Sequence, residues 1–273
     1  MTGLTVWVAS YPKSGNTWLR AVYAALRGRT EPNINALGSH GPARALFDGA
    51  LGVRSSDLSP DEVDALRPRA DEAMIASLNG DSWRKIHDAL FAGPRDELIV
   101  SVSATRAALY LVRDPRDVAV SLAHHADLTL HEAVDYLSSS TSLETSGRSL
   151  QAQLRQRLGS WSEHVRSWTD NPPFPVHVLR YEDCVTQPVP TFRAAFAEGG
   201  LDATEDEVAA AVARSSLVRL QAQEVALGFR EAHSRHSPFF RQGLVGGWKD
   251  ELPADLARRV VDMHGEVMTR YGY

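Results

Sequence analysis

The amino-acid sequence predicts an α/β fold, with a central, mainly parallel sheet flanked by helices in a single domain that spans residues 1–273. Short β-prone runs alternate with longer helical patterns, which is typical of a parallel sheet covered on both faces. A glycine-containing loop joins the first expected strand to the first expected helix. The sequence has no repeat of fixed period, no low-complexity tract and no convincing linker, so one continuous sheet is the simplest expectation.

The first strand and helix lie near the N-terminus. Residues Thr5–Ser10 contain the β-prone run Val-Trp-Val and stop at a loop that holds Pro12 and Gly15. Apolar side chains then recur at helical spacing over residues 18–26, and Gly28 stands where a helix C-cap is expected. The order is therefore strand, glycine loop, helix.

Further helical and strand patterns continue to the C-terminus, although residues 29–58 lack clear periodicity. Capping boxes, in which Ser or Thr is followed three residues later by Glu, predict helix starts at Ser59 and Thr204. β-rich apolar runs bounded by turn residues predict strands. The expected helices cover residues 59–79, 115–126, 148–168, 204–214 and 253–271, and the expected strands are Glu97–Val102, Ala107–Val112 and Val176–Tyr181.

The composition excludes several classes of function. A net charge of −5 disfavours a protein that coats nucleic acid or an anionic membrane, because both partners need a cationic surface. No segment approaches the roughly 18 apolar residues of a membrane span. Cys184 is the only cysteine, so no intrachain disulfide forms and a reducing cytoplasm fits best. HExxH, CxxC and spaced acidic clusters are absent, so no metal is expected.

An anion site is expected between the first strand and helix. Ligands of parallel α/β sheets bind at the carboxyl ends of the strands, where the loops Tyr11–Gly15 and Arg113–Asp117 fall. Backbone amides at the start of a helix converge on an anion, and Lys13 adds a full positive charge. The loop is not a Walker A motif, because the lysine precedes the glycine. An ordinary turn needs only the glycine.

The stretch Tyr-Pro-Lys-Ser-Gly-Asn-Thr-Trp, residues 11–18, resembles the 5′-phosphosulfate loop YPKSGTTW of the cytosolic sulfotransferase family, with Asn16 in place of the first threonine. The resemblance implies a P-loop nucleotide-kinase-like sulfotransferase fold and the donor 3′-phosphoadenosine 5′-phosphosulfate (PAPS), which leaves as PAP. It also implies that Lys13 contacts the bridging oxygen and 5′-phosphate, and that Trp18 stacks on adenine. The residues implied to hold phosphate and sulfate are Ser14, Gly15, Asn16 and Thr17.

A second match concerns the 3′-phosphate. Arg113, followed eight positions later by Ser121, resembles the family's 3′-phosphate motif. A guanidinium at a strand end and a hydroxyl on the next helix are able to share one phosphate. Alone, the run Arg-Asp-Pro-Arg-Asp is more often a salt-bridged connection; paired with the first loop, it indicates a phosphate site.

Weaker matches follow in the family's order. Tyr181 begins a YED run, whose tyrosine in the family approaches the adenine, and Ser215 and Leu217 stand at a Thr-Ser-Phe motif that implies a hydroxyl and an apolar contact with the base. Residues 241–249 resemble the signature RKGxxGDWK, whose first three residues grip the 3′-phosphate; here they are Arg241, Gln242 and Gly243, so one cationic contact is lost. Residues 159–165 resemble the start of a family helix.

The candidate base lies upstream of the 3′-phosphate strand. Lys85-Ile86-His87 stands where the family has a Lys-Thr-His segment with its catalytic histidine. A histidine with an ordinary pKa near 6.5 accepts a hydroxyl proton near neutral pH. Lys85 is expected to orient donor and acceptor or to stabilise the sulfuryl oxygens. His233 and His236 are alternatives near the acceptor. Packed or solvated roles are expected for His124, His125, His131, His164 and His264.

The resemblance implies in-line transfer of a sulfuryl group from PAPS to a hydroxyl of a small molecule: a phenol, a natural-product alcohol or a sugar. Residues 29–58, 128–159 and 224–240 are the expected acceptor walls, and the composition is compatible with bacterial secondary metabolism. A P-loop kinase is the alternative enzyme, disfavoured by the missing GK[ST] and Mg²⁺ carboxylates. Gln242 keeps a non-catalytic PAP-binding protein open. The family's dimer pattern KxxxTVxxxE is missing, which leaves a homodimer open.

Overall fold

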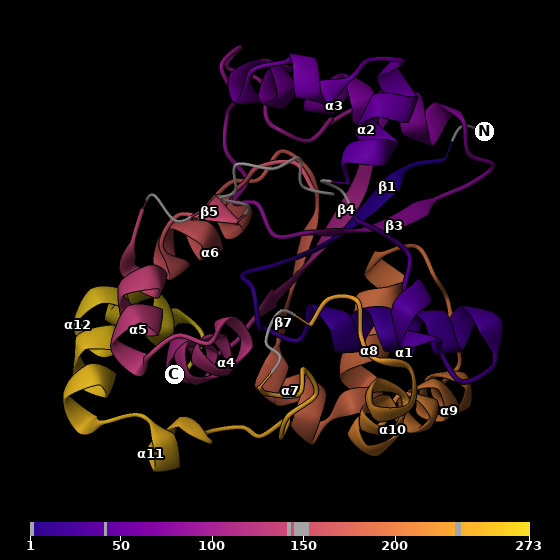
Figure 1. Ribbon diagram of the computed structural model, residues 1–273. Coiled ribbons are helices and arrows are strands. Elements are labelled where there is room, and N and C mark those ends of the chain that lie inside the picture. The colour runs from indigo at the N-terminus through magenta and orange to yellow at the C-terminus, as the bar shows by residue number, and fades with distance from the viewer. Residues whose placement is uncertain (1–2, 41–42, 141–142, 145–152, 233–235) are drawn as a thin grey trace. The chain divides into compact units, whose positions relative to one another are not determined.

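The computed structural model describes residues 3–40, 43–140, 143–144, 153–232 and 236–273 (Figure 1). A five-stranded sheet has the strand order β2-β3-β1-β4-β7, and β5 and β6 form a separate antiparallel pair. The strands are β1 (Thr5–Ser10), β2 (Ser39–His40), β3 (Ser82–Ile86), β4 (Thr105–Val112), β5 (Leu143–Glu144), β6 (Gln156–Arg157) and β7 (Val176–Arg180). These elements confirm the predicted α/β class.

Helices separate most of the strands. The α-helices are α1 (Asn16–Gly28), α2 (Arg44–Leu51), α3 (Pro60–Ala76), α4 (Pro115–Ala126), α5 (Leu130–Ser138), α6 (Trp161–Thr169), α7 (Tyr181–Thr186), α8 (Pro188–Glu198), α9 (Glu205–Arg214), α10 (Leu217–Leu227), α11 (Trp248–Glu251) and α12 (Ala254–Arg270). Two short 3₁₀ helices are η1 (Ile34–Ala36) and η2 (Ser55–Asp57). No helix of the described residues is long and apolar enough to cross a bilayer.

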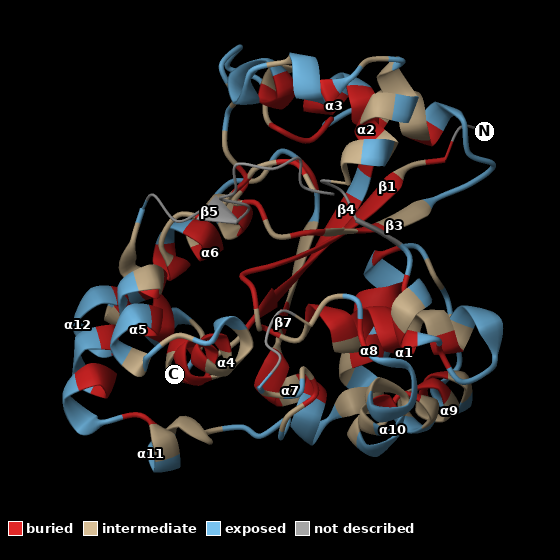
Figure 2. Cartoon of the chain, in the orientation of Figure 1, coloured by how far each residue is buried: buried red, intermediate tan, exposed pale blue. Residues whose placement is uncertain are grey.

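The strands β1 and β3 are parallel and in register, so Thr5 pairs with Ser82 and Ala9 pairs with Ile86. Their carboxyl ends therefore stand side by side, which brings the residue after β3 next to the end of β1. All six residues of β1 are buried, and Figure 2 shows the same for nearly all of β4. Such continuous burial is expected of strands covered on both faces.

The chain divides into two compact units. The first comprises residues 1–11, 39–110 and 140–178, and in it α2 packs on α3 around Phe47, Val63 and Ala70. The second comprises residues 12–38, 111–139 and 179–273; α1, α8 and α9 pack together there, and α4 and α5 pack with α12 (Figure 1).

Most expected elements are confirmed. The strand Thr5–Ser10 and the helices at residues 60, 115, 205 and 254 lie where the patterns predicted them, and both capping boxes are formed by side chain and backbone. One cap differs: Gly28 is the last residue of α1, and Arg29 is the C-cap, with a φ of 53°.

The expected strand Glu97–Val102 is wrong. Apart from an isolated bridge between Leu98 and Ala92, the segment is a loop whose Ile99 and Val100 are buried. A short apolar run does not separate a buried loop from a strand. The strand in this part of the chain is β3, which was not predicted because it contains charged residues. One of them, Arg84, is buried and pairs with Asp71 at 2.7 Å.

The expected helix 148–168 is also wrong in its first half. Its described part begins at residue 153, contains β6 and becomes helical only at Trp161, after a capping box of Ser160 and Glu163; residues 148–152 lie outside the described residues. Residues 29–58, for which no element was predicted, contain η1, β2, α2 and η2. Short helices such as α2 give too few turns for a clear period.

Candidate active site

The loop between β1 and α1 has a backbone conformation that suits an anion. Gly15 is the N-cap of α1 with a φ of 101°, and Lys13 has a φ of 69°. A non-glycine residue in this region carries strain, which is common at functional sites. The first turn of α1 contains no acidic side chain, and the positive end of its dipole favours an anion.

Arg113, at the end of β4, ties this loop to the C-terminal motif. Its guanidinium donates hydrogen bonds to the carbonyl oxygens of Lys13 at 3.1 Å and of Leu244 at 3.0 Å, and it lies 4.3 Å above the Tyr181 ring. Arg113 Nε is buried and has no hydrogen-bond partner among the described residues. One side chain thus joins three of the segments that the sequence placed at the donor.

Tyr181 packs between two glycines of those segments. A Cβ at Gly15 would lie 2.7 Å from the Tyr181 ring, and a Cβ at Gly243 would lie 3.6 Å from its hydroxyl and 3.1 Å from Leu217. Both glycines have positive φ. The structure therefore brings Gly15, Tyr181, Leu217 and Gly243 together, and a side chain at either glycine would crowd Tyr181 or Leu217.

Trp18 belongs to the same group of residues. Its indole nitrogen donates to the carbonyl oxygen of Ser215 at 3.1 Å, its ring contacts the Tyr181 ring edge-on at 6.3 Å, and it packs with Leu217 against one apolar cluster. The hydroxyls of Ser14 and Ser215 are buried and have no partner among the described residues. Buried polar atoms normally have a partner, so these fit a polar ligand.

Asp117 fixes the C-terminal motif to the start of α4. Its two carboxylate oxygens accept hydrogen bonds from the amides of Gly246 and Trp248, both at 2.8 Å. Arg116 lies 4.1 Å above the Trp248 ring and pairs with Asp114 at 2.7 Å. The run Arg-Asp-Pro-Arg-Asp is therefore also a salt-bridged connection, and the roles of Asp117 and Arg116 were not predicted.

The first two residues of the RKG-like motif differ in their surroundings. Arg241 pairs with Glu251 at 2.7 Å, and the same carboxylate accepts a 2.7 Å contact from His124 on α4. Ser121 stands one helical turn before His124 and is half-buried. Gln242 is exposed. Sequence reasoning did not identify Glu251.

An aromatic cluster faces the lysine of the donor loop. The ammonium of Lys13 lies 3.9 Å from the centroid of Phe239, which contacts Phe229, Phe240 and His125. In the sequence, only the pair Phe239-Phe240 after Pro238 hinted at this contact. Phe239 lies in the expected acceptor wall 224–240; of the alternative bases there, His236 is exposed and His233 lies outside the described residues.

His87 follows β3 directly and meets the end of β1. Its Nδ1 lies 2.8 Å from the carbonyl oxygen of Ser10 and 3.3 Å from the Ser10 hydroxyl. Because a carbonyl oxygen only accepts, Nδ1 carries the hydrogen, and in the neutral ring the lone pair is on Nε2. Lys85 stands two residues earlier on β3, half-buried, on the same face of the strand.

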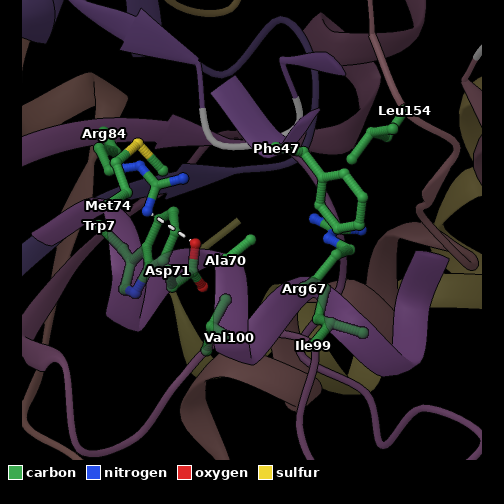
Figure 3. Close-up of a pocket in the computed structure, with 10 residues that line it drawn as sticks. All are labelled: Trp7, Phe47, Arg67, Ala70, Asp71, Met74, Arg84, Ile99, Val100 and Leu154. Atoms are coloured by element: carbon green, nitrogen blue, oxygen red, sulfur yellow. Dashed lines mark hydrogen bonds and ion pairs between the residues drawn. The ribbon is translucent and has the colours of Figure 1, made fainter. Parts of the chain in front are cut away.

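A small pocket in the first unit is unrelated to this chemistry (Figure 3). It lies where α3 meets β1 and β3, and it has room for about one water molecule. Its polar walls are the pair Arg84–Asp71 and Arg67, which binds Asp88 with two hydrogen bonds. Burial raises the pKa of Asp71, against the opposing effect of Arg84. The pocket is a packed ion-pair network.

Two further features are the single cysteine and the side chains that commonly bind metals. Cys184 is fully buried, and burial raises the pKa of its thiol to about 12, which suits a packing role. No cluster of three or more His, Cys, Asp or Glu side chains suited to a metal occurs in the part of the chain that the structure describes.

The sequence also resembles known proteins. The sequence profile of the sulfotransferase domain family matches residues 95–272. Cytosolic sulfotransferase 16 of Arabidopsis thaliana is 26% identical over 269 residues, covering 93% of this chain and 72% of that protein. Amine sulfotransferase of Oryctolagus cuniculus is 24% identical, with coverages of 93% and 77%.

Solved structures show the same fold. Mouse sulfotransferase SULT7A1 complexed with PAP superposes with a TM-score of 0.61 and 19% identity, over 97% of this chain and 84% of that one. Retinol dehydratase in complex with androsterone and PAP gives a TM-score of 0.62 and 17% identity, over 97% and 80%.

Proposed function

This chain belongs to the sulfotransferase domain family, and from that premise we propose that it transfers a sulfuryl group from PAPS to a hydroxyl of a small-molecule acceptor. One observation carries the choice of donor: Arg113 joins the loop of Lys13, Tyr181 and the Leu244 segment within one unit. These are the segments that match the family's donor motifs. The PAP that accompanies both similar structures supports the same nucleotide.

The residues present fit the three charged or aromatic parts of this nucleotide. The loop amides and Lys13 suit the 5′-phosphosulfate, and the buried Ser14 hydroxyl, which has no protein partner among the described residues, supports that placement. Trp18, Tyr181, Ser215 and Leu217 would hold the adenine. For the 3′-phosphate, Arg113 with its buried Nε is the main contact, assisted by Ser121, Arg241, Gln242 and Gly243.

When bound, PAPS supplies the sulfuryl group, which leaves the 5′-phosphate and joins the acceptor oxygen. His87 takes the acceptor proton on Nε2, since its Nδ1 hydrogen is donated to Ser10. Lys13, the amides of residues 14–17 and the hydroxyl of Thr17 stabilise the charge on the leaving phosphate, and Lys85 orients donor and acceptor or stabilises the sulfuryl oxygens. No covalent enzyme intermediate is needed. We propose that the enzyme acts in the cytoplasm.

Thermal unfolding with nucleotides tests the donor. PAP should raise the melting temperature, because a ligand that binds only the native state stabilises it by RT ln(1 + [L]/Kd), about 2.7 kcal/mol at 100 times Kd. ATP with Mg²⁺ should raise it much less. Strong stabilisation by ATP–Mg²⁺ and none by PAP would replace this proposal with a kinase. Incubation with PAPS and a panel of phenols, alcohols and sugars, scored by a one-SO₃ mass gain, then identifies the acceptor.

A further inference from the structure

A buried histidine on α6 contacts the backbone of His87. His164 Nε2 lies 2.9 Å from the His87 carbonyl oxygen, and its Nδ1 lies 2.8 Å from the Tyr110 hydroxyl. The carbonyl only accepts, so Nε2 carries the hydrogen and Nδ1 accepts from the tyrosine. Both side chains are completely buried. In the neutral Nε2–H tautomer, both ring nitrogens of His164 therefore have a hydrogen-bond partner.

The same ring also contacts the donor loop. Tyr11, the first residue of the stretch 11–18, packs edge-on against His164 with ring centroids 5.4 Å apart. Tyr11 follows Ser10, whose carbonyl oxygen binds His87 Nδ1. His164 therefore contacts both the backbone of His87 and Tyr11. Tyr11 adjoins Ser10, which orients the His87 ring.

Burial keeps His164 neutral in the range where the enzyme would work. It lowers the pKa of His164 to about 4, although the hydrogen bond to His87 opposes this shift. A neutral ring donates one hydrogen bond and accepts one, as the two contacts require. The arrangement thus stays intact across neutral pH.

We propose that His164 is a positioning residue of the sulfuryl transfer: it holds the peptide of His87 against the start of the donor loop, so that His87 Nε2 is directed at the acceptor. The proposal rests on His87 being the general base. Small displacements of a catalytic group are costly, and about 1 Å is worth roughly 100-fold in rate.

Two neighbours on α6 make comparable contacts and provide matched controls. Trp168 Nε1 donates to the carbonyl oxygen of Asp88 at 3.0 Å, and the Ser167 hydroxyl accepts from the amide of Leu90 at 2.9 Å. If α6 only anchors the loop after β3, losing any of these bonds should have a similar effect. If His164 positions the base, its own bond should matter most for turnover.

The experiment compares His164→Gln with His164→Asn. A glutamine amide reaches the place of Nε2 and still donates to the His87 carbonyl, whereas an asparagine amide reaches the place of Nδ1 and pairs only with Tyr110. Turnover is measured with PAPS and with 2-naphthol and benzyl alcohol as acceptor probes. We expect kcat to fall roughly 10- to 100-fold in His164→Asn and less than about 5-fold in His164→Gln, with PAP affinity unchanged in both.

Controls separate this result from general damage. Trp168→Phe removes the neighbouring bond and should lower stability with little change in kcat. Equal kcat losses in His164→Asn, His164→Gln and Trp168→Phe, or no loss in His164→Asn, would overturn the proposal. His87→Ala is measured beside these variants. If His87→Ala keeps its turnover, His87 is not the base. If His87→Ala loses turnover while His164→Asn keeps a normal kcat, only the positioning role of His164 is refuted.

A measurement on the wild-type protein needs no variant to fold. The ¹⁵N shifts of the imidazole rings distinguish the tautomers, and we expect Nε2–H for His164 and Nδ1–H for His87 at pH 7. An Nδ1–H tautomer at His164, or a ring that titrates near pH 6.5, would contradict the hydrogen bonds on which the proposal depends.

Discussion

Arg241 donates to Glu251 at 2.7 Å, so the arginine assigned to the 3′-phosphate is held by a carboxylate of its own chain. The other oxygen of Glu251 contacts His124 at 2.7 Å. A phosphate that binds Arg241 must therefore share the guanidinium with Glu251 or displace it. Both side chains are about one quarter exposed, so water weakens the pair and an exchange costs little.

Glu251→Gln should tighten PAP several-fold, because it removes the negative charge nearest Arg241 while keeping the side-chain volume. Isothermal titration with PAP and with adenosine 5′-phosphosulfate, which lacks the 3′-phosphate, measures the effect, and only PAP should gain. Weaker PAP binding in this variant would show instead that Glu251 orients Arg241 for the phosphate.

Arg113→Ala should weaken PAP by roughly 10- to 100-fold more than adenosine 5′-phosphosulfate, since only PAP loses a charge-assisted bond worth about 1.5–3 kcal/mol. Both nucleotides should weaken somewhat, because Arg113 also binds the carbonyls of Lys13 and Leu244. Equal losses for the two nucleotides, measured by titration, would remove Arg113 from the 3′-phosphate.

His87→Ala should keep PAP affinity and lose about 10²–10⁴-fold in kcat, because a general base acts on the acceptor proton and does not hold the nucleotide. The loss should be smaller for 4-nitrophenol, which is already acidic, than for benzyl alcohol. Near-normal kcat with benzyl alcohol would exclude the assignment and make His236 or His233 the next candidates.

Gly15→Ala should destabilise the protein by about 2 kcal/mol or more and weaken PAP, because φ is 101° and the new methyl would lie 2.7 Å from the Tyr181 ring. Gly49→Ala is the matched control: this helical glycine of α2 has open space around it, so alanine should stabilise by about 0.5–1 kcal/mol. Urea unfolding measures both, and equal stabilities would argue against a tightly packed loop.

His164 should make the protein acid-sensitive. Its pKa falls from 6.5 to about 4 on folding, so below pH 6.5 the unfolded state binds more protons and stability falls with pH, until the native ring protonates near pH 4. The total is roughly 3 kcal/mol at about 1.4 kcal/mol per unit. Urea unfolding at pH 7.5, 6 and 5 should show about 2 kcal/mol of this loss by pH 5 in wild type and much less in His164→Gln; the same pH dependence in both would place its origin elsewhere.

Local signals sufficed for the elements with strong caps or continuous burial. The capping boxes at Ser59 and Thr204, and the run Thr5–Ser10, predicted element positions well because each is decided by neighbouring residues. Local signals failed for β3, where the buried Arg84 pairs with Asp71 of a different element, the helix α3. The expected strand 97–102 failed for the converse reason, since its apolar residues are buried without a strand ladder.

The residues of the candidate site also fall into two groups, those that local motifs predicted and those that they missed. The motifs proposed a set of donor residues, and the structure brings Gly15, Arg113, Tyr181 and Gly243 into contact with one another or with shared neighbours. Phe239 and Glu251 escaped notice because their contacts with Lys13 and with His124 join residues that are distant in the sequence. No local pattern encodes a cation over a ring or a carboxylate shared by an arginine and a histidine.

The buried thiol of Cys184 has a practical consequence for spectroscopy. As the only cysteine, with its pKa raised to about 12, it should not react with maleimides at neutral pH in the folded state. A cysteine introduced at Val225, which is 89% exposed on α10, would then be the single reactive position. Spin labels or fluorophores are therefore attachable to the wild-type background without first removing a native residue.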